Sequence, residues 1–344
     1  MDVNIITFHR DYNYGAMLQA YALQEFLGQI GHPAGVFDYI RPKNASGSLK
    51  QQLLDFVCRL NKKDCEIRET KYREFYKSFL KLNNDCTKSV YVTGSDQVWN
   101  PHGVMDEHYF LTFVPQTSKK ISYAASLGVS EIPEERKATF KRYIQDFDAV
   151  SVREESAKEC ISELYDREIS VNVDPTLLHD KNFWRTIAEP VENMPEKYIL
   201  VYLMHLPKNI NKILTWLKKE TGYDIVVVDG QGAVQGVLTN AVKHNKAVHR
   251  AGPQQFVWLM DHAQCVVTSS FHGTAFSLIF EKEFYAITNS PKSRLANILN
   301  KCSLPFFEET EADFVRNDNI DWLKVSAVLK NEREKAKQYF QGVL

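Results

Sequence analysis

Short apolar runs alternate with longer amphipathic segments along the first half of the chain. The run "VNIITF" (3–8) has the length and composition of a buried strand, and apolar positions recur at helical spacing in the segment that follows, 16–31. Strands alternating with helices of this length predict a parallel sheet with right-handed crossovers. Further strand-like runs lie at 34–40, 89–96, 119–126, 148–154 and 169–178, with helical patterns at 133–146 and 154–165.

A polar stretch, "AEPVENMPEK" (188–197), interrupts the alternation, which then restarts. We therefore predict an α/β protein of two facing Rossmann-like, doubly wound domains, residues 1–187 and 188–319, with a cleft between them. Ligands of such sheets bind beyond the carboxyl ends of the strands. The later strand-like runs are 198–204, 224–229, 264–269 and 284–288, and the later helical patterns are 208–222, 252–263, 274–282 and 294–302.

Two charged segments stand outside this alternation. Residues 48–82 have the pattern of two amphipathic helices, which would form an insertion or a cover. Residues 320–344 predict a C-terminal helix that either packs across the first domain or caps the second.

Charge and cysteine usage narrow the class of protein. The chain has 42 Lys and Arg against 43 Asp and Glu, a balance that argues against nucleic-acid binding. Its six cysteines show no C-x-x-C pair and no zinc-like spacing, so we expect a reducing compartment and no metal. Because neither a signal-peptide pattern nor a long apolar run is present, we expect a cytoplasmic location without a membrane span. Peripheral association with a membrane stays open.

The loop after the first predicted strand ends in a glycine. In "FHRDYNYGAMLQ" (8–19), Gly15 opens a helix whose free backbone N–H groups suit an anion, with Asn13 and Tyr14 beside it. A turn with local caps explains the same residues. The chain contains neither G-x-G-x-x-G nor G-x-x-x-x-G-K-[ST], so no dinucleotide fingerprint or P-loop supports this site.

The segment "TGSDQVWN" (93–100) is unusually polar for a strand end. Ser95, Gln97 and Asn100 could bind sugar hydroxyls, and Asp96 could also accept a proton from one. An Asx-type turn is the structural alternative.

Two later strand ends carry charged residues. Arg153, in "SVREESA" (151–157), is suited to a bidentate contact with phosphate or carboxylate, although an ion pair with a neighbouring glutamate explains it equally well. Asp174 in "VDPTLL" (173–178) is interpreted as structural, because the following proline keeps it extended.

The segment "TSSFHGTAFSLIF" (268–280) places polar residues where a strand gives way to a helix. Gly273 permits close approach of the backbone, and Ser270 and Thr274 flank the helix start. An imidazole can exchange a proton at physiological pH, so His272 could deliver one. A lone histidine is more often structural, but the coincidence of these features favours a functional role.

Six segments in this order resemble the polysaccharide pyruvyl transferase family: "NYGAMLQAYALQ", "GSDQVWN", "YAASLG", "SVREESA", "VDPTLL" and "SSFHGTAFSLIF". The resemblance implies a fold similar to glycosyltransferases of the GT-B type. It also implies transfer of a pyruvyl group from phosphoenolpyruvate, a co-substrate, to a sugar of a surface polysaccharide precursor, which forms a cyclic ketal. No cofactor is implied, and the acceptor would be a saccharide, lipid-linked or nucleotide-linked.

Roles for individual residues follow from that reaction. His272 would be the general acid, Asp96 and Gln97 would orient hydroxyls, and Arg153 would hold anions with the helix starts near Gly15 and Gly273. Many family members carry an arginine two residues before the histidine, where this chain has Ser270. The candidates to replace that arginine are Arg294, Arg250 and Arg10.

Two other functions stay open at this stage. A GT-B-type glycosyltransferase would need a nucleotide-sugar site, for which residues 229–231 and 252–254 are the candidates. A binding partner in a polysaccharide assembly complex would need no catalytic residues.

Overall fold

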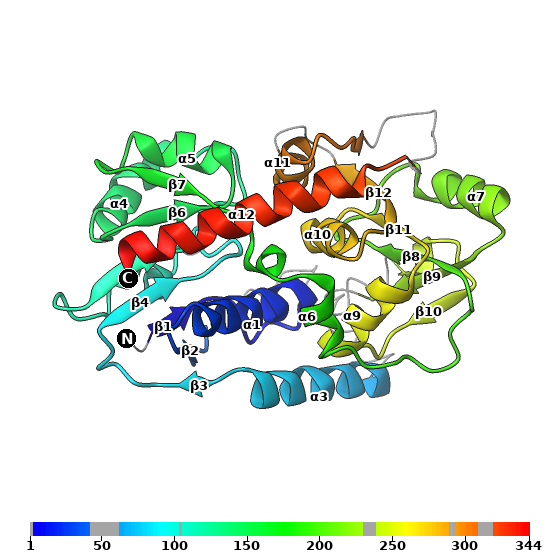
Figure 1. Cartoon of the computed structure of the whole chain (residues 1–344), viewed down its shortest axis with the longest axis horizontal. Helices are drawn as coiled ribbons and strands as arrows, with labels where there is room; N and C mark the ends of the chain where they lie inside the picture. Colours follow the sequence, from blue (N-terminus) through cyan, green and yellow to red (C-terminus); the bar gives the residue numbers. More distant parts are fainter. Residues whose placement is uncertain are drawn as a thin grey trace.

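The structure, a computed structural model, describes residues 3–41, 62–102, 105–229, 239–288, 290, 293–308 and 319–344. Two parallel β-sheets, each packed with helices, lie side by side (Figure 1). This arrangement confirms the prediction of an α/β fold with two Rossmann-like units.

The first sheet has the strand order β3-β2-β1-β4-β5, and the parallel pair β6-β7 extends it through bridges such as Ile121 to Ala149. Strand β1 lies centrally, and its residue Ile5 is in register with Val36 and Val92 on its two neighbours. All four residues of β1 are buried, as expected for a strand covered on both faces. The strands are β1 (Val3–Ile6), β2 (Ala34–Phe37), β3 (Leu82–Asn83), β4 (Val90–Thr93), β5 (Lys119–Ser122), β6 (Val150–Val152) and β7 (Ile169–Val171).

The helices of this half begin at polar caps. The Asn13 side chain accepts from the backbone N–H of Ala16 at the start of α1, and Asp180 accepts from Asn182 at the start of α6. The helical segments are α1 (Tyr14–Gln29), α3 (Lys62–Phe79), η1 (Glu107–Phe110), α4 (Glu134–Ile144), α5 (Glu155–Ser162), η2 (Pro175–Leu178) and α6 (Lys181–Arg185).

The second sheet has the order β10-β9-β8-β11-β12-β13, with every pair parallel. Two of its helices begin at serine N-caps, which are Ser270 for α10 and Ser293 for α11. Both caps face the half of the molecule that contains the first sheet. Its strands are β8 (Tyr198–Tyr202), β9 (Asp224–Val228), β10 (Lys246–Val248), β11 (Cys265–Thr268), β12 (Glu283–Thr288) and β13 (Phe307–Glu308). Its helices are α7 (Ile210–Thr221), α9 (Pro253–His262), α10 (Phe271–Ile279) and α11 (Arg294–Lys301).

The differences from the predicted elements have local causes. The run 169–178 is predicted as a strand that leads into a loop, and the structure has β7 followed by the short helix η2, which Asp174 caps and which begins at Pro175. Helix α10 begins at Phe271, three residues before the predicted 274. The edge strands β3, β10 and β13 are only two or three residues long, so no apolar run marked them. Of the charged segment 48–82, α3 is observed and residues 48–61 lie outside the described part.

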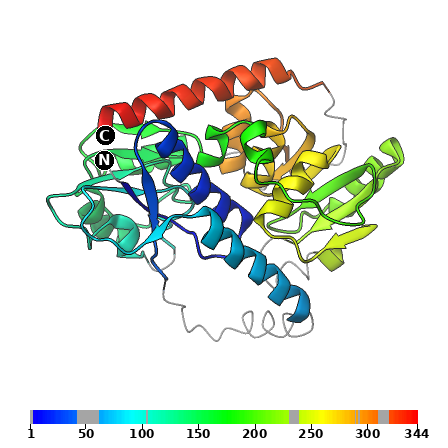
Figure 2. The same ribbon diagram turned by 60° about the horizontal axis from the view of Figure 1, so that its bottom comes forward.

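The C-terminal helix α12 (Trp322–Val343) starts beside the second sheet and runs back across the first (Figures 1 and 2). Arg333 donates from Nε to the carbonyl of Leu177 at 2.9 Å, and the Tyr339 hydroxyl donates to the carbonyl of Ser122 at 2.7 Å. Of the two arrangements that the sequence left open, the helix packs across the first domain. It therefore ties the two halves together.

Among the described helices, none combines the length and apolarity that crossing a bilayer requires.

The strap formed by α12 predicts a stability difference between two positions on it. Phe340 is fully buried and its ring stacks on Tyr123 with centroids 4.8 Å apart, whereas Leu323 is 87% exposed. We expect Phe340→Ala to lower the free energy of unfolding by about 3–5 kcal/mol, from lost burial and the cavity left behind. The control, Leu323→Ala, should change it by less than about 0.5 kcal/mol. Equal effects in urea unfolding would contradict this packing.

Candidate active site

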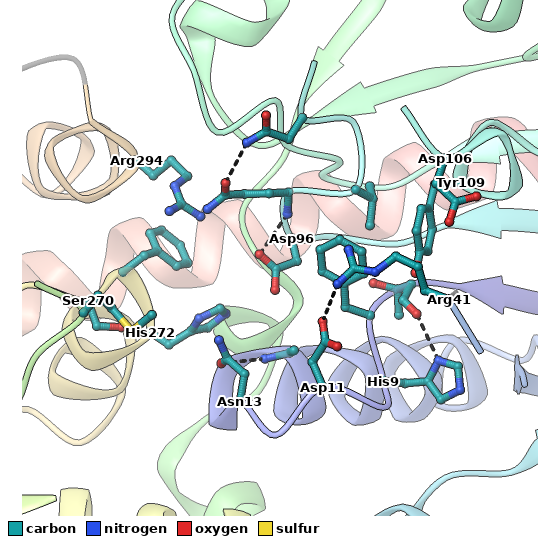
Figure 3. Close-up of a pocket in the computed structure, with 18 of the residues that line it drawn as sticks. His9, Asp11, Asn13, Arg41, Asp96, Asp106, Tyr109, Ser270, His272 and Arg294 are labelled. Atoms are coloured by element: carbon teal, nitrogen blue, oxygen red, sulfur yellow. Dashed lines mark hydrogen bonds and ion pairs between the residues drawn. The ribbon is translucent and has the colours of Figure 1, made fainter. Parts of the chain in front are cut away.

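A cleft with a volume of about 1410 Å³ opens where the carboxyl ends of strands from both sheets face each other. Its walls come from the loops after β1 and β4 on one side and from the starts of α10 and α11 on the other (Figure 3). Because these loops follow parallel strands, their polar residues meet at one edge of each sheet. Of the segments that the sequence singled out, 8–19, 93–100 and 268–280 contribute residues to this lining, and Arg294 does so as well.

His272 lies at this edge in the first turn of α10 and is 7% exposed. Its Nε2 is buried and lies 3.6 Å from Oδ2 of Asp174, an ion pair when the ring is protonated. The other side of the ring lies over Gly15, where a Cβ would overlap the imidazole. Gly15 is therefore needed so that the histidine can rest against the start of α1.

Asp174 is completely buried and forms the centre of a network beneath the cleft. Its Oδ2 accepts from Ser95 Oγ at 2.8 Å and from Arg153 Nη1 at 2.7 Å. Its Oδ1 accepts from the backbone and the hydroxyl of Thr176 at 3.0 and 2.8 Å. Burial by itself would raise the pKa of Asp174, but His272, Arg153 and the Thr176 amide hold that pKa well below its usual range. The carboxylate therefore stays ionised.

Arg153 belongs to this network and not to the cleft lining. Its Nε donates to Glu154 at 2.9 Å, and the guanidinium lies 4.5 Å from the ring centroid of Phe271. Burial would lower the pKa of Arg153, but Glu154 and Asp174 raise it. Two carboxylates already pair with this guanidinium, as in the ion-pair alternative. Arg153 is therefore not placed for the direct contact with an anion that the sequence suggested.

Arg294 brings a guanidinium to the cleft from the start of α11. With its amide oxygen toward Arg294, Gln97 accepts from Nη1 at 3.0 Å and Nη2 at 2.7 Å. Burial lowers the pKa of Arg294, and the charge of Arg153 lowers it further. Among the described residues, no carboxylate forms an ion pair with Arg294. This arginine is therefore able to meet an anionic ligand.

The other two candidate arginines have carboxylate partners. Arg10 lines the cleft but pairs with Asp38, and Arg250 pairs with Asp64 at 2.6 Å. Arg294 is thus the candidate that the geometry favours.

Asp96 sits in a strained backbone conformation at the cleft wall. Its φ is 80°, a left-handed value that is uncommon outside glycine. Its Oδ1 accepts from the backbone N–H of Gln97 at 2.8 Å. Gln97, Asn100 and Asn13 line the same cleft, as the sequence predicted for a site of hydroxyl contacts.

Four predicted site residues are buried behind the cleft wall, which corrects their expected direct contacts. Tyr14 stacks on Phe256 with centroids 4.4 Å apart and donates to the carbonyl of Ala251. Ser95 donates to Asp174, as described above. The hydroxyl of Thr274 donates to the carbonyl of Ser270 at 3.1 Å. A Cβ at Gly273 would overlap Thr268, so that glycine serves helix packing. Ser270 itself lines the cleft and accepts from the Gly273 N–H as the cap of α10.

Sequence reasoning missed a group of residues at the far end of the cleft. The Tyr39 hydroxyl donates to Asp106 Oδ2 at 2.8 Å, and its ring stacks on His108 at 4.0 Å. Asp11 and Arg41 lie 3.6 Å apart beside them (Figure 3). Only Asp11 carried a signal, since it lies in the polar loop after the first strand. Among the described residues, no group of three or more His, Cys, Asp or Glu side chains is arranged to hold a metal ion.

Solved structures with a similar fold include two that are described as UDP-GlcNAc 2-epimerases, both at very low identity. UDP-GlcNAc 2-epimerase from Methanocaldococcus jannaschii is 12% identical, with a TM-score of 0.50 over 96% of this chain and 92% of the other. A protein assigned as UDP-N-acetylglucosamine 2-epimerase from Listeria monocytogenes is 13% identical, with a TM-score of 0.52 over 98% and 90%. These likenesses show the GT-B-type fold alone.

No protein of curated function matches the chain in sequence. The sequence profile described as polysaccharide pyruvyl transferase matches residues 13–291, a span that includes Asp96 and His272 but neither Asp11 nor Arg294. The chain therefore belongs to the polysaccharide pyruvyl transferase family, which is a family of transferases.

Proposed function

We propose that the protein transfers a pyruvyl group from phosphoenolpyruvate to two hydroxyls of a saccharide, a precursor of a surface polysaccharide, and so forms a cyclic ketal. The observation that carries the proposal is the position of His272. Its imidazole lies at the cleft edge against a buried carboxylate, and Arg294 and Asp96 line the same cleft (Figure 3).

His272 acts as the general acid. Its Nε2 is turned to the buried Asp174 and its Nδ1 lies against Gly15 at the start of α1, while the residue itself lines the cleft. The ring delivers a proton to C3 of the enolpyruvyl group, which leaves positive charge at C2 for a hydroxyl to attack. Asp174 acts through His272: its carboxylate faces Nε2 of the ring, keeps the ring in place and stabilises its protonated form.

Arg294 holds the donor. Phosphoenolpyruvate presents a carboxylate and a phosphate, both of which suit the fork of donors on a guanidinium. Gln97 orients that fork through two hydrogen bonds. The free N–H groups at the starts of α1 and α10 add favourable contacts for the anion. Arg294 thus takes over the role of the arginine that many family members carry at the position of Ser270.

Asp96 receives a proton from an attacking hydroxyl, and Asn13, Gln97 and Asn100 orient the saccharide. Strain at a single backbone position is tolerated where the surroundings fix it. Here the Asp96 carbonyl accepts from the Ser126 N–H at 3.0 Å, which holds the unusual conformation.

The nucleotide-sugar alternative finds less support in the residues that it requires. Asp229 is buried and hydrogen-bonded to Thr239 and to His249 Nδ1. A Cβ at Gly252 would approach the Lys71 side chain, so this glycine serves packing with α3. Neither residue lines the cleft, and residues 230 and 231 lie outside the described part.

The general-acid role predicts a large loss of turnover in His272→Ala. Phosphate release from phosphoenolpyruvate, measured with methyl glycosides as acceptors, should fall by about a hundredfold or more. His102 is an exposed imidazole on the same cleft, so His102→Ala is the matched control and should keep wild-type turnover. Near wild-type release by a folded His272→Ala protein would remove His272 from this role.

The buried carboxylate predicts a pH-dependent contribution to stability. Since the pKa of Asp174 is lowered in the folded state, its contribution is present above the unfolded pKa of about 3.9 and is lost as the pH falls through the folded value. Asp174→Asn should lower the free energy of unfolding at pH 7 by about 3–5 kcal/mol, because the buried Arg153 loses one of its two carboxylate partners.

Urea unfolding of wild type and Asp174→Asn at several pH values measures this contribution. Glu155→Gln, at an exposed position in α5, is the control. The difference in the free energy of unfolding between wild type and Asp174→Asn should become smaller as the pH falls below about 4. If this difference stayed constant with pH, or if there were none at pH 7, the proposed stabilising role of the Asp174 network would be wrong.

A further inference from the structure

A second carboxylate, that of Asp11, lies near Asp96 on the same side of the cleft. The two residues follow β1 and β4, which are paired with Ile6 in register with Thr93, so both loops leave the same edge of the sheet. Figure 3 shows both carboxylates turned into the space between His272 and Arg41. Both residues line the cleft.

Each of these carboxylates keeps one oxygen for a ligand. Asp11 faces Arg41 with its Oδ2, 3.6 Å from Nη2, and Asp96 uses Oδ1 for the Gln97 amide. Among the described residues, none donates a hydrogen bond to the remaining oxygen of either one. Burial raises the pKa of Asp11, Arg41 opposes that change, and the charge of Asp96 raises the pKa further. The last effect is the one expected of two carboxylates that share a site.

Arg41 lies beside Asp11 in the cleft. Its guanidinium lies 4.9 Å from the ring centroid of Phe8, which also belongs to the cleft wall. The Asp11 and Arg41 side chains are 45% and 49% exposed, so Arg41 places a positive charge beside Asp11 without holding it rigidly.

We propose that Asp11 is a second catalytic carboxylate, which binds one acceptor hydroxyl while Asp96 binds the other. This role rests on the proposed function. Ketal formation differs from an ordinary glycosyl transfer because two hydroxyls react, and each must lose a proton. A single carboxylate serves one hydroxyl at a time, whereas two neighbouring carboxylates hold both hydroxyls of a diol.

The atoms and charges balance in two steps. First, the ring of His272 gives a proton to C3, and the first hydroxyl oxygen forms a bond to C2 as its proton passes to Asp96. Second, the bond between C2 and the phosphate oxygen breaks, and the second hydroxyl oxygen bonds to C2 as its proton passes to Asp11. The two protons return to His272 and to the departing phosphate. The products are the ketal and hydrogen phosphate, and no oxidant or reductant is needed.

The test compares Asp11→Asn with Glu107→Gln, a carboxamide change at an exposed carboxylate of the same cleft. Acceptor kinetics are measured by phosphate release, with the methyl glycosides of glucose, galactose and mannose as diol probes. Donor binding is measured separately, as the rise in melting temperature that phosphoenolpyruvate causes without acceptor.

We expect kcat/KM for the best diol to fall by about a hundredfold in Asp11→Asn. The melting shift with phosphoenolpyruvate should stay at the wild-type value, because Asp11 lies on the acceptor side. Asp11→Glu should recover part of the activity, and Glu107→Gln should behave as wild type.

Three results would overturn the role. Wild-type acceptor kinetics in a folded Asp11→Asn protein would exclude it. Loss of the melting shift in that variant would place Asp11 at the donor instead. A wild-type chain that neither binds phosphoenolpyruvate nor releases phosphate from it would overturn the proposed function, and the role of Asp11 with it.

Discussion

A single buried carboxylate, that of Asp174, joins the parts of this molecule that form its cleft. Ser95 reaches it from the loop after β4, Arg153 from the end of β6, and His272 from the second sheet. A fully buried carboxylate costs several kcal/mol unless charges and hydrogen bonds compensate for the lost water. The fold therefore has to bring these partners together. In doing so it fixes the imidazole at the edge of the cleft.

Each half of the molecule contributes different cleft residues around that carboxylate. The second sheet supplies His272 and Arg294 from the starts of two helices, and the first sheet supplies Asp96 and Asp11 from the ends of two adjacent strands. Since all these positions follow parallel strands, their meeting is a consequence of topology. The strap α12 then keeps the two halves in contact.

Much of the fold and part of the site could be predicted from the sequence. Apolar runs such as 198–204 gave the strands, because parallel strands are buried on both faces and read as continuous apolar segments. The cleft positions of His272, Asp96 and Arg294 could be predicted because each follows a predicted strand. Those signals are local, and they depend on no contact between distant segments.

The rest depends on contacts that no local pattern encodes. Asp174 was interpreted as structural because it precedes a proline, and its pairing with His272 joins residues far apart in the chain. Arg153 stands at a strand end as predicted, but its partners turn it away from the cleft lining. Arg41 directly follows the predicted strand 34–40, but no local pattern pairs it with another loop, so only the folded structure places it beside Asp11.

The most direct test is a crystal structure of the protein with phosphoenolpyruvate bound. The geometry predicts that the ligand's acidic groups contact the Arg294 guanidinium, with its C3 beside the imidazole of His272, while Nε2 stays against Asp174. A ligand held elsewhere, or a His272 ring turned away from both Asp174 and the donor, would contradict the proposed site.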